Sequence, residues 1–390
     1  MSKNCELCGR DTLQAVYEPE RSTRGLKIHL CDHCGLLQSL PRIDRAPRAA
    51  MAVSSGADWG NVRYGKGFRT KAAIDALIRH TDLAQEFSIL DAGSNRGSFA
   101  RALLNAAPHA ELVALEPDER VAGLCAGLPR TELISARIED AALETGRFDI
   151  IHSCHTLEHL ASPLAVLRDH WRTLKPGGLL VLDVPNVAII ESHDIVEEWF
   201  IDKHLTHFSV ATLTAMVESA GFEIVQKPDP HDRENLLIVA RRGTGSIPLV
   251  ARNERETENA RRLIAAYGAI RAQNIEALSA VAAEIAQLAP KRIAVWGAGR
   301  LFDSLVVHGG FDPQILTLLI DTHLKAHVGE RFGVPVSGAE ALKDANVGAI
   351  IVMSRSFAAE IEREARARAP RAEILFYSDL VAQARLRRAA

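Results

Sequence analysis

Four cysteines near the start of this 390-residue sequence stand in two closely spaced pairs, Cys5-x-x-Cys8 and Cys31-x-x-Cys34. Two such pairs can place four thiolates at the corners of a tetrahedron, which is the geometry that structural zinc prefers. A full set of four ligands leaves no position open for water, so the metal would hold a small module together rather than take part in a reaction. The sequence therefore predicts a structural zinc site; the alternative is a set of reduced thiols that bind no metal.

A glycine turn that follows an apolar segment is the second chemical motif. Residues 88–92 have the composition of a buried strand, and Gly93 and Gly97 follow at a spacing of four. In an open α/β sheet, ligands lie at the carboxyl ends of the strands, and glycine is needed where the backbone closely approaches the ligand. The next strand, 111–115, ends at Glu116, where a carboxylate can accept hydrogen bonds from both hydroxyls of a ribose. This pattern predicts a cofactor site; the turn alone would also suit a dinucleotide, or a strand, turn and helix with only a structural role.

The motif Asp91-x-Gly93-x-x-x-Gly97, taken with Glu116, resembles the S-adenosylmethionine site of class I methyltransferases. Asn95 stands where that family has its middle glycine, and asparagine tolerates the left-handed backbone conformation better than most residues. The resemblance implies that S-adenosylmethionine is the cofactor. The residues that would hold it are Asp91, Gly93, Asn95, Gly97 and Glu116, with Ile138 packed against the adenine.

The segments that follow keep the order of the same family from about residue 81 to residue 242. They are an apolar strand at 148–153, the stretch Leu157-Glu158-His159, the sequence Leu174-Lys175-Pro176-Gly177-Gly178, a further strand at 179–184, and a closing hairpin at 222–225 and 235–240. Leu157, Leu160, Leu164 and Leu167 recur at helical spacing, which predicts a helix directly after the strand at 148–153. The resemblance implies a seven-stranded methyltransferase sheet.

An insertion near residues 190–213 is the place where we expect the acceptor site. A zinc module, a class I domain and a second Rossmann-like domain together resemble the sugar C-methyltransferases that act on nucleotide-linked deoxysugars. That family carries Tyr-x-Glu-His, a hydrophobic residue and then Tyr-Phe-Ser in this insertion. His204, Phe208 and Ser209 match the pattern, whereas Ile201 and Lys203 stand in place of its tyrosine and glutamate.

Proton removal from the acceptor needs a positioned base. The resemblance gives that role to His204, with His207 as a further candidate, while Lys203 would stabilise an oxyanion. A second interpretation is that His204 and His207, three residues apart on one helical face, only hold the insertion together. Glu158 and His159 would shape the floor of the pocket, and the nearby His155 is an alternative base.

The fold class predicted for the chain is α/β, with an N-terminal zinc ribbon, a Rossmann-like class I methyltransferase domain and a C-terminal Rossmann-like domain. The predicted divisions are 1–50 for the zinc module, 51–242 for the methyltransferase domain, 243–288 for a linker and a connecting helix broken once, and 289–390 for the last domain. The composition of residues 40–59 indicates a connector. The aromatic loop of Trp59, Tyr64 and Phe68 could cap a cofactor or simply anchor this connector.

Composition limits the partners. The formal net charge is −3 and lysine and arginine form no long block, so nucleic acid is not an expected partner. No uninterrupted apolar stretch of about 18 residues is present, and no apolar run follows the first residues, so we expect a soluble, cytoplasmic protein without a membrane partner.

The resemblance implies methyl transfer from S-adenosylmethionine to a small molecule, foremost a nucleotide-linked sugar. Carbon is the family's acceptor atom, and the altered base motif leaves oxygen or nitrogen as further candidates. Two other classes stay open. One is a scaffold or regulator that binds S-adenosylmethionine without chemistry. The other is an NAD-dependent oxidoreductase that uses the C-terminal turn Gly297-Ala298-Gly299 with Asp321.

Overall fold

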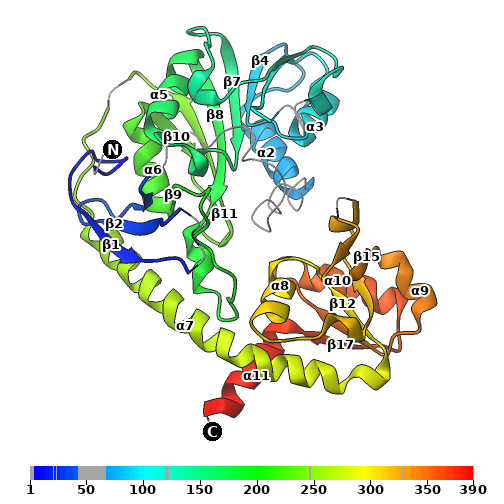
Figure 1. Cartoon of the computed structure of the whole chain (residues 1–390). Helices are drawn as coiled ribbons and strands as arrows, with labels where there is room; N and C mark the ends of the chain where they lie inside the picture. Colours follow the sequence, from blue (N-terminus) through cyan, green and yellow to red (C-terminus); the bar gives the residue numbers. More distant parts are fainter. Residues whose placement is uncertain are drawn as a thin grey trace. The chain divides into compact units, whose positions relative to one another are not determined.

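The computed structural model describes residues 4–20, 22, 24–42, 67–118, 123–245, 247–326 and 328–389. Most of the expected connector at 40–59, and Trp59, Tyr64 and the side chain of Phe68 in the aromatic loop, lie outside these residues. The described chain separates into two compact units, one made of residues up to 42, 67–189 and 200–264, the other of 190–199 and 265–389. The N-terminal cysteine module thus belongs to the same unit as the methyltransferase-like segments (Figure 1).

The first unit is built on a seven-stranded sheet with the order β10-β11-β8-β7-β4-β5-β6. Five of its strands are parallel, and β10 and β11 form an antiparallel hairpin at one edge, which confirms the predicted closing hairpin. The strands are β4 (Ser88–Ala92), β5 (Glu111–Leu115), β6 (Thr131–Ile134), β7 (Phe148–Cys154), β8 (Leu174–Pro185), β10 (Phe222–Gln226) and β11 (Asn235–Arg242).

Helices cover both faces of this sheet, which explains why its strands are almost continuously apolar. Alternate side chains of β4 enter different cores: Ile89 packs with Leu77 and Leu103, whereas Leu90 packs with Leu167 and Leu213. Figure 1 shows α2 and α3 on one side of the sheet and α5 and α6 on the other. The helices are α2 (Gly67–His80), α3 (Ser98–Ala106), α5 (Pro163–Thr173) and α6 (Val210–Ser219).

Local sequence explains where two of these helices begin. Ser209 caps α6: its hydroxyl accepts a hydrogen bond from the Thr212 amide, and the Thr212 side chain accepts one from the Ser209 amide, which forms a capping box. The expectation of a helix directly after β7 was wrong, because α5 begins only at Pro163. Proline favours the first helical turn and disfavours helical backbone just before it, so Leu157–His159 forms a separate 3-10 turn, η5.

A second, four-stranded sheet holds the N-terminal module, with the order β1-β2-β3-β9. Its strands are β1 (Leu13–Tyr17), β2 (Lys27–Cys31), β3 (Leu37–Leu40) and β9 (Thr206–His207). The last strand comes from the predicted acceptor insertion, and it pairs antiparallel to β3 through Leu37 and His207. Residues of the insertion therefore complete the sheet of the cysteine module.

The second unit contains a parallel sheet with the order β15-β13-β12-β16-β17 and a short antiparallel strand, β14, at its edge. This is a Rossmann-like arrangement, as expected for the C-terminal domain. The strands are β12 (Ile293–Trp296), β13 (Leu316–Ile320), β14 (Glu330–Arg331), β15 (Val334–Ser337), β16 (Ala349–Val352) and β17 (Glu373–Phe376). The helices are α8 (Arg300–Val307), α9 (Leu342–Ala345), α10 (Ala358–Arg368) and α11 (Tyr377–Ala389).

The long helix α7 (Glu254–Gln287) runs without interruption, so the predicted single break was wrong. Gly268 lies inside it, but one glycine costs only about 1 kcal/mol relative to alanine, and the many alanine, glutamate and arginine residues around it favour helix. The boundary between the two units falls within this helix, after Ile264. Among the described residues, we find no helix with the length and apolar character needed to span a bilayer.

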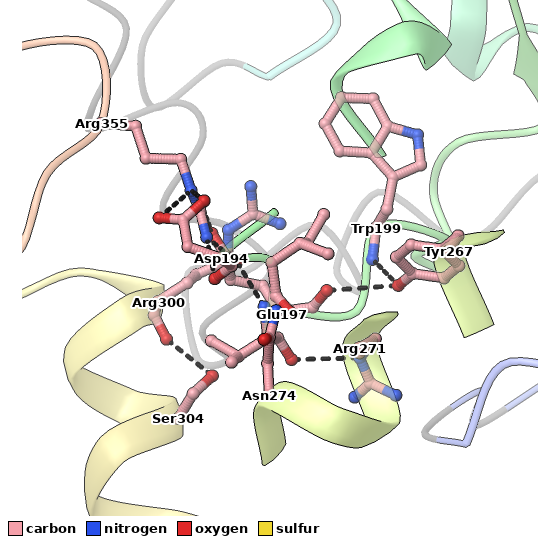
Figure 2. A network of polar contacts seen from close by, with 11 residues as sticks. Asp194, Glu197, Trp199, Tyr267, Arg271, Asn274, Arg300, Ser304 and Arg355 are labelled. Carbon is pink, nitrogen blue, oxygen red and sulfur yellow. Dashed lines mark hydrogen bonds and ion pairs between the residues drawn. The ribbon is translucent and has the colours of Figure 1, made fainter. Parts of the chain in front are cut away.

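Part of the predicted insertion, Ile190–Trp199, is grouped with the second unit. The guanidinium of Arg355 holds it there: Nε donates to the Asp194 carboxylate at 2.8 and 2.9 Å, and Nη1 donates to Glu197 at 2.7 Å (Figure 2). The buried Asn274 adds two bonds from its amide to backbone carbonyls of the same segment, each 2.9 Å long. These contacts fix the segment onto the C-terminal sheet domain.

Candidate functional site

The turn after β4 has the backbone conformation that its glycines predict. Gly93, Asn95 and Gly97 have positive φ angles of 83°, 46° and 70°. The amide of Gly93 donates to the carbonyl of Leu115 at 2.9 Å, which anchors the turn to the end of β5. A Cβ added to Gly93 would lie only 2.2 Å from the hydroxyl oxygen of Thr156, so a side chain at this position would collide with the segment after β7.

Glu116 lies beside this turn, at the carboxyl end of β5. Its Oε2 accepts a hydrogen bond from the Asn95 amide at 2.8 Å, and its Oε1 accepts one from the Asp118 amide at 2.9 Å. The residue is 7% exposed, and burial raises the pKa of its carboxyl, while these two bonds act in the opposite direction. Each carboxylate oxygen has a second lone pair, so the chemistry of this group fits the two hydroxyls of a ribose.

Asp91, the acid that opens the motif, is paired with a residue that the sequence reasoning missed. Its Oδ1 lies 2.7 Å from Nδ1 of His152, which sits directly opposite it on β7. The His152 ring stacks on Phe99 with a centroid separation of 3.5 Å. The other oxygen, Oδ2, is buried and has no hydrogen-bond partner within the described part of the chain. The motif acid therefore keeps one acceptor atom uncommitted.

Ile138 lies in the 3-10 turn η4 (Ile138–Asp140) after β6. It is 8% exposed and belongs to the same apolar cluster as Leu115, the last residue of β5, and Leu157, which lies in η5 after β7. This is the edge of the sheet that also carries the glycine turn. Its contact with an adenine stays a prediction.

Side chains from two segments meet next to the turn. Glu158 is 1% exposed, and neither of its carboxylate oxygens has a hydrogen-bond partner among the described residues. Its Oε1 lies 3.4 Å from Nδ1 of His155 and 3.7 Å from Nε2 of His159. His204 joins them from the insertion, because its ring centroid is 4.9 Å from that of His159. One ligand-type atom from each of Glu158, His159 and His204 lies within 4.8 Å of the others.

Burial sets the charges of this cluster. It raises the pKa of Glu158 to about 8 and lowers the pKa of His159 to about 4. Burial likewise lowers the pKa of His155 and that of His204 well below that of an exposed imidazole. The three imidazoles are therefore neutral near pH 7, and a neutral imidazole has a lone pair that can take a proton or bind a cation.

Backbone bonds fix the two segments of the cluster to each other. The Leu205 amide donates to the Glu158 carbonyl at 2.7 Å, and Nδ1 of His159 bonds the Lys203 carbonyl at 2.9 Å. The N-terminal module holds the same loop from the other side, because the Ser39 hydroxyl donates to the His204 carbonyl at 2.9 Å. The cysteine module thus supports the loop that carries the predicted base.

The structure does not place His207 and His204 on one helical face, because His207 lies in β9 and His204 in the loop before it. Nε2 of His207 bonds the Ser39 hydroxyl at 3.0 Å, and the ring packs edge-on against Phe200 at 4.7 Å. Burial lowers the pKa of His207 to about 3. His207 thus contacts Ser39 of β3 and Phe200. The carbonyl of Lys203, in contrast, accepts a hydrogen bond from Nδ1 of His159, a member of the cluster.

Two further groups beside the cluster could not be chosen from the sequence. Asp183, at the end of β8, is 5% exposed, and burial raises its pKa to about 6. Arg69 of α2 is 8% exposed, and its positive charge lowers the pKa of Asp183, of Glu158 and of His155. Both lie in ordinary strand and helix sequence, and only the fold brings them to the carboxyl edge of the sheet.

The four N-terminal cysteines converge as their spacing predicts. The sulfur atoms of Cys5 and Cys34 are 3.5 Å apart, as are those of Cys8 and Cys31, and all four lie within 4.8 Å of one another. Zn–S bonds of about 2.3 Å in a tetrahedron give sulfur separations of about 3.8 Å. The two printed separations are therefore close to those that a zinc ion requires, and the four thiols could serve as its ligands.

Comparison with known proteins agrees with this geometry. Residues 65–227 match the family model described as a methyltransferase domain. A probable S-adenosylmethionine-dependent methyltransferase of Mycolicibacterium smegmatis is 25% identical over 159 residues, which are 40% of this chain and 59% of that protein. A trans-aconitate 2-methyltransferase of Acidovorax ebreus is 28% identical over 144 residues, or 36% of this chain and 55% of that protein.

A ubiquinone biosynthesis O-methyltransferase of Xanthomonas oryzae pv. oryzae is 29% identical over 117 residues, which are 29% of this chain and 48% of that protein. The chain thus spans about half the length of these curated relatives. The strand order, the glycine turn and the family match together define a methyltransferase domain of the S-adenosylmethionine-dependent class within this chain.

Proposed function

We propose that the whole protein transfers a methyl group from S-adenosylmethionine to a small-molecule acceptor. The observation that carries this proposal is the placement of Glu116 against the left-handed turn of Gly93, Asn95 and Gly97 at the carboxyl edge of the sheet. When bound, the cofactor supplies an electrophilic methyl group. Asp91, the turn residues and Glu116 would hold it, with Ile138 beside its adenine.

The acceptor would bind next to this turn, at the cluster of Glu158, His159 and His204. Thr156 links the two regions, because its hydroxyl donates to the Ala92 carbonyl at 3.3 Å. Positioning of two reactants at near-attack distance supplies a large part of the rate in such displacements, and buried side chains exclude water from the reacting atoms.

The foremost acceptor is a nucleotide-linked sugar, as the resemblance to sugar C-methyltransferases implies. Two of the relatives carry the names of other small molecules, trans-aconitate and ubiquinone, so the sugar rests on the resemblance alone. His204 is neutral and could accept the acceptor's proton, Lys203 could stabilise negative charge on oxygen, and His207 would support the loop.

We further propose that Cys5, Cys8, Cys31 and Cys34 bind a structural zinc ion. The metal would stabilise the module that contains β3. Ser39 of β3 bonds the His204 carbonyl and β3 pairs with β9, so an ordered module would in turn hold the His204 loop. A module of this size has little apolar core of its own, and metal binding then contributes directly to its folding.

The test is incubation of the full chain with S-adenosylmethionine and a panel of nucleotide sugars, together with a metabolite extract. Mass spectrometry should detect a product heavier than its acceptor by one methylene group, formed only when cofactor and protein are both present. Failure to form any such product, with cofactor binding intact, would favour the alternative of a non-catalytic scaffold that binds S-adenosylmethionine.

A further inference from the structure

The geometry points to a divalent-cation site in the cluster where the acceptor is proposed to bind, with Glu158, His159 and His204 as its three protein ligands. These residues come from η5 and from the loop before β9, and one ligand-type atom of each lies within 4.8 Å of the others. The site is separate from the cysteine cluster, and it uses nitrogen and oxygen rather than sulfur ligands.

Hydrogen bonding determines which nitrogen of His159 faces the site. Its Nδ1 bonds the Lys203 carbonyl at 2.9 Å, and a carbonyl can only accept, so Nδ1 must carry the proton. The lone pair of the neutral ring is then on Nε2, which faces Oε1 of Glu158 at 3.7 Å. Histidines that bind a metal usually donate the N–H of their other ring nitrogen to an acceptor such as a carbonyl. That hydrogen bond fixes the tautomer and the orientation of the ring.

When Glu158 is ionised, as a metal ligand must be, two acceptors therefore face each other. A shared proton does not satisfy them, since 3.7 Å exceeds the length of a hydrogen bond, and both Glu158 oxygens lack a hydrogen-bond partner within the described residues. A cation about 2.1 Å from each ligand atom requires ligand separations of about 3.0–3.4 Å in octahedral or tetrahedral geometry. The Glu158–His159 separation of 3.7 Å is near this range and the separations to His204 are below 4.8 Å, so side-chain rotations would complete the site.

His155 supports the same interpretation from the opposite side. Its Nε2 bonds the amide oxygen of Asn235 at 3.2 Å, which leaves Nδ1 as the nitrogen that faces Glu158 Oε1 at 3.4 Å. Asp183 adds a second buried carboxylate in the neighbourhood and offsets the positive charge of Arg69. A buried carboxylate without a hydrogen-bond partner among the described residues is stabilised strongly by a bound cation.

Two imidazoles and one carboxylate leave coordination positions open, as catalytic metal sites do. If the proposed methyl transfer is correct, these positions would take a hydroxyl or carboxylate oxygen of the acceptor. The cation would orient that oxygen and lower the pKa of a bound hydroxyl. His204 then acts as a ligand and not as the base.

The experiment uses the full chain with its cysteine site loaded with zinc, and the probe is Mn²⁺, which prefers nitrogen and oxygen ligands to thiolates. Free Mn²⁺ is followed by its electron paramagnetic resonance signal in the absence of S-adenosylmethionine. We expect one Mn²⁺ bound per chain. The near-isosteric Glu158→Gln should weaken its binding by about 100-fold or more, since loss of outer-shell partners alone costs about 10–100-fold.

The matched control is His170→Leu, which removes a buried imidazole of α5 outside the cluster and should leave Mn²⁺ affinity unchanged. Co²⁺ provides a second readout: it should give visible absorption bands without the thiolate charge-transfer band of a cysteine site, and His159→Ala should abolish them. Absence of Mn²⁺ and Co²⁺ binding, or equal Mn²⁺ affinity in wild type and Glu158→Gln, would overturn the proposal.

The affinity of the same samples for S-adenosylmethionine is measured separately. A protein that binds the cation but not S-adenosylmethionine would refute the proposed function and leave the cation site standing.

Discussion

Replacement of Gly93 by alanine tests the idea that the turn after β4 is confined by the segment that follows β7. Gly93 has a φ of +83°, and its added Cβ would lie 2.2 Å from the Thr156 hydroxyl oxygen. Left-handed backbone costs alanine about 1–2 kcal/mol. Overpacking in a tight site costs about 1–3 kcal/mol more. We therefore expect Gly93→Ala to lower the free energy of unfolding by about 2–5 kcal/mol.

Gly146 offers a matched control, because its φ is +67° but nothing lies within 4 Å of its added Cβ. Gly146→Ala should therefore cost only the backbone contribution of about 1–2 kcal/mol. The difference between the two variants isolates the collision with Thr156. Urea unfolding followed by circular dichroism measures both, and isothermal calorimetry should show weaker binding of S-adenosylmethionine for Gly93→Ala alone.

A double variant makes the reasoning refutable. Thr156→Ala removes the hydroxyl and leaves the Thr156 Cβ at 3.3 Å from the added methyl group, a separation that small shifts can relieve. Gly93→Ala combined with Thr156→Ala should recover most of the overpacking cost, so the two changes should be strongly non-additive. Additive costs, or equal losses for Gly93→Ala and Gly146→Ala, would contradict the close approach.

Three other changes have expected outcomes. Arg355→Met leaves the buried carboxylates of Asp194 and Glu197 without their cation, so urea unfolding should show a loss of about 3–5 kcal/mol; a loss below about 1 kcal/mol would be inconsistent with the network. Burial lowers the pKa of His170 to about 4, so only the unfolded chain gains a proton at this residue as the pH falls from about 6.5, and His170 should add up to about 3 kcal/mol to the loss of stability that other buried histidines also cause through that window. His170→Leu should flatten this slope, and an unchanged pH profile would show that His170 is not its source. Cys34→Ser should reduce the zinc content from one ion per chain to none in elemental analysis, and full retention of zinc would exclude Cys34 as a ligand.

The local features of the cofactor turn could be predicted from sequence because each depends on neighbouring residues. Gly93 and Gly97 mark a left-handed turn, and Asn95 adopts the same conformation as one of the few residues that tolerate it. The spacing of the cysteine pairs likewise predicts that their four sulfur atoms lie close together. Ser209 and Thr212 are three residues apart and together indicate where α6 begins.

Other features depend on contacts between distant segments. Nothing near Asp194 indicates that its partner is Arg355, and the pairing of β3 with β9 joins segments with no shared pattern. The sequence analysis selected both Glu158 and His204, but it gave them separate roles: Glu158 in the floor of the pocket and His204 as a base. Only the folded chain brings them within reach of one cation. The predicted break in α7 was wrong for a different reason, since the many strong helix formers of this segment outweigh local irregularities in its sequence.

Calorimetry of the full chain with S-adenosylmethionine, compared with the Glu116→Gln variant, tests the central claim most directly. In the variant an NH2 group replaces one carboxylate oxygen and cannot accept a hydrogen bond from a ribose hydroxyl, and the loss of one such charge-assisted bond is worth about 1.5–3 kcal/mol. We predict saturable binding to the wild type and a dissociation constant about 10- to 150-fold higher in the variant. Absence of binding to folded wild-type protein, or equal affinity in both, would contradict the assignment of the cofactor site.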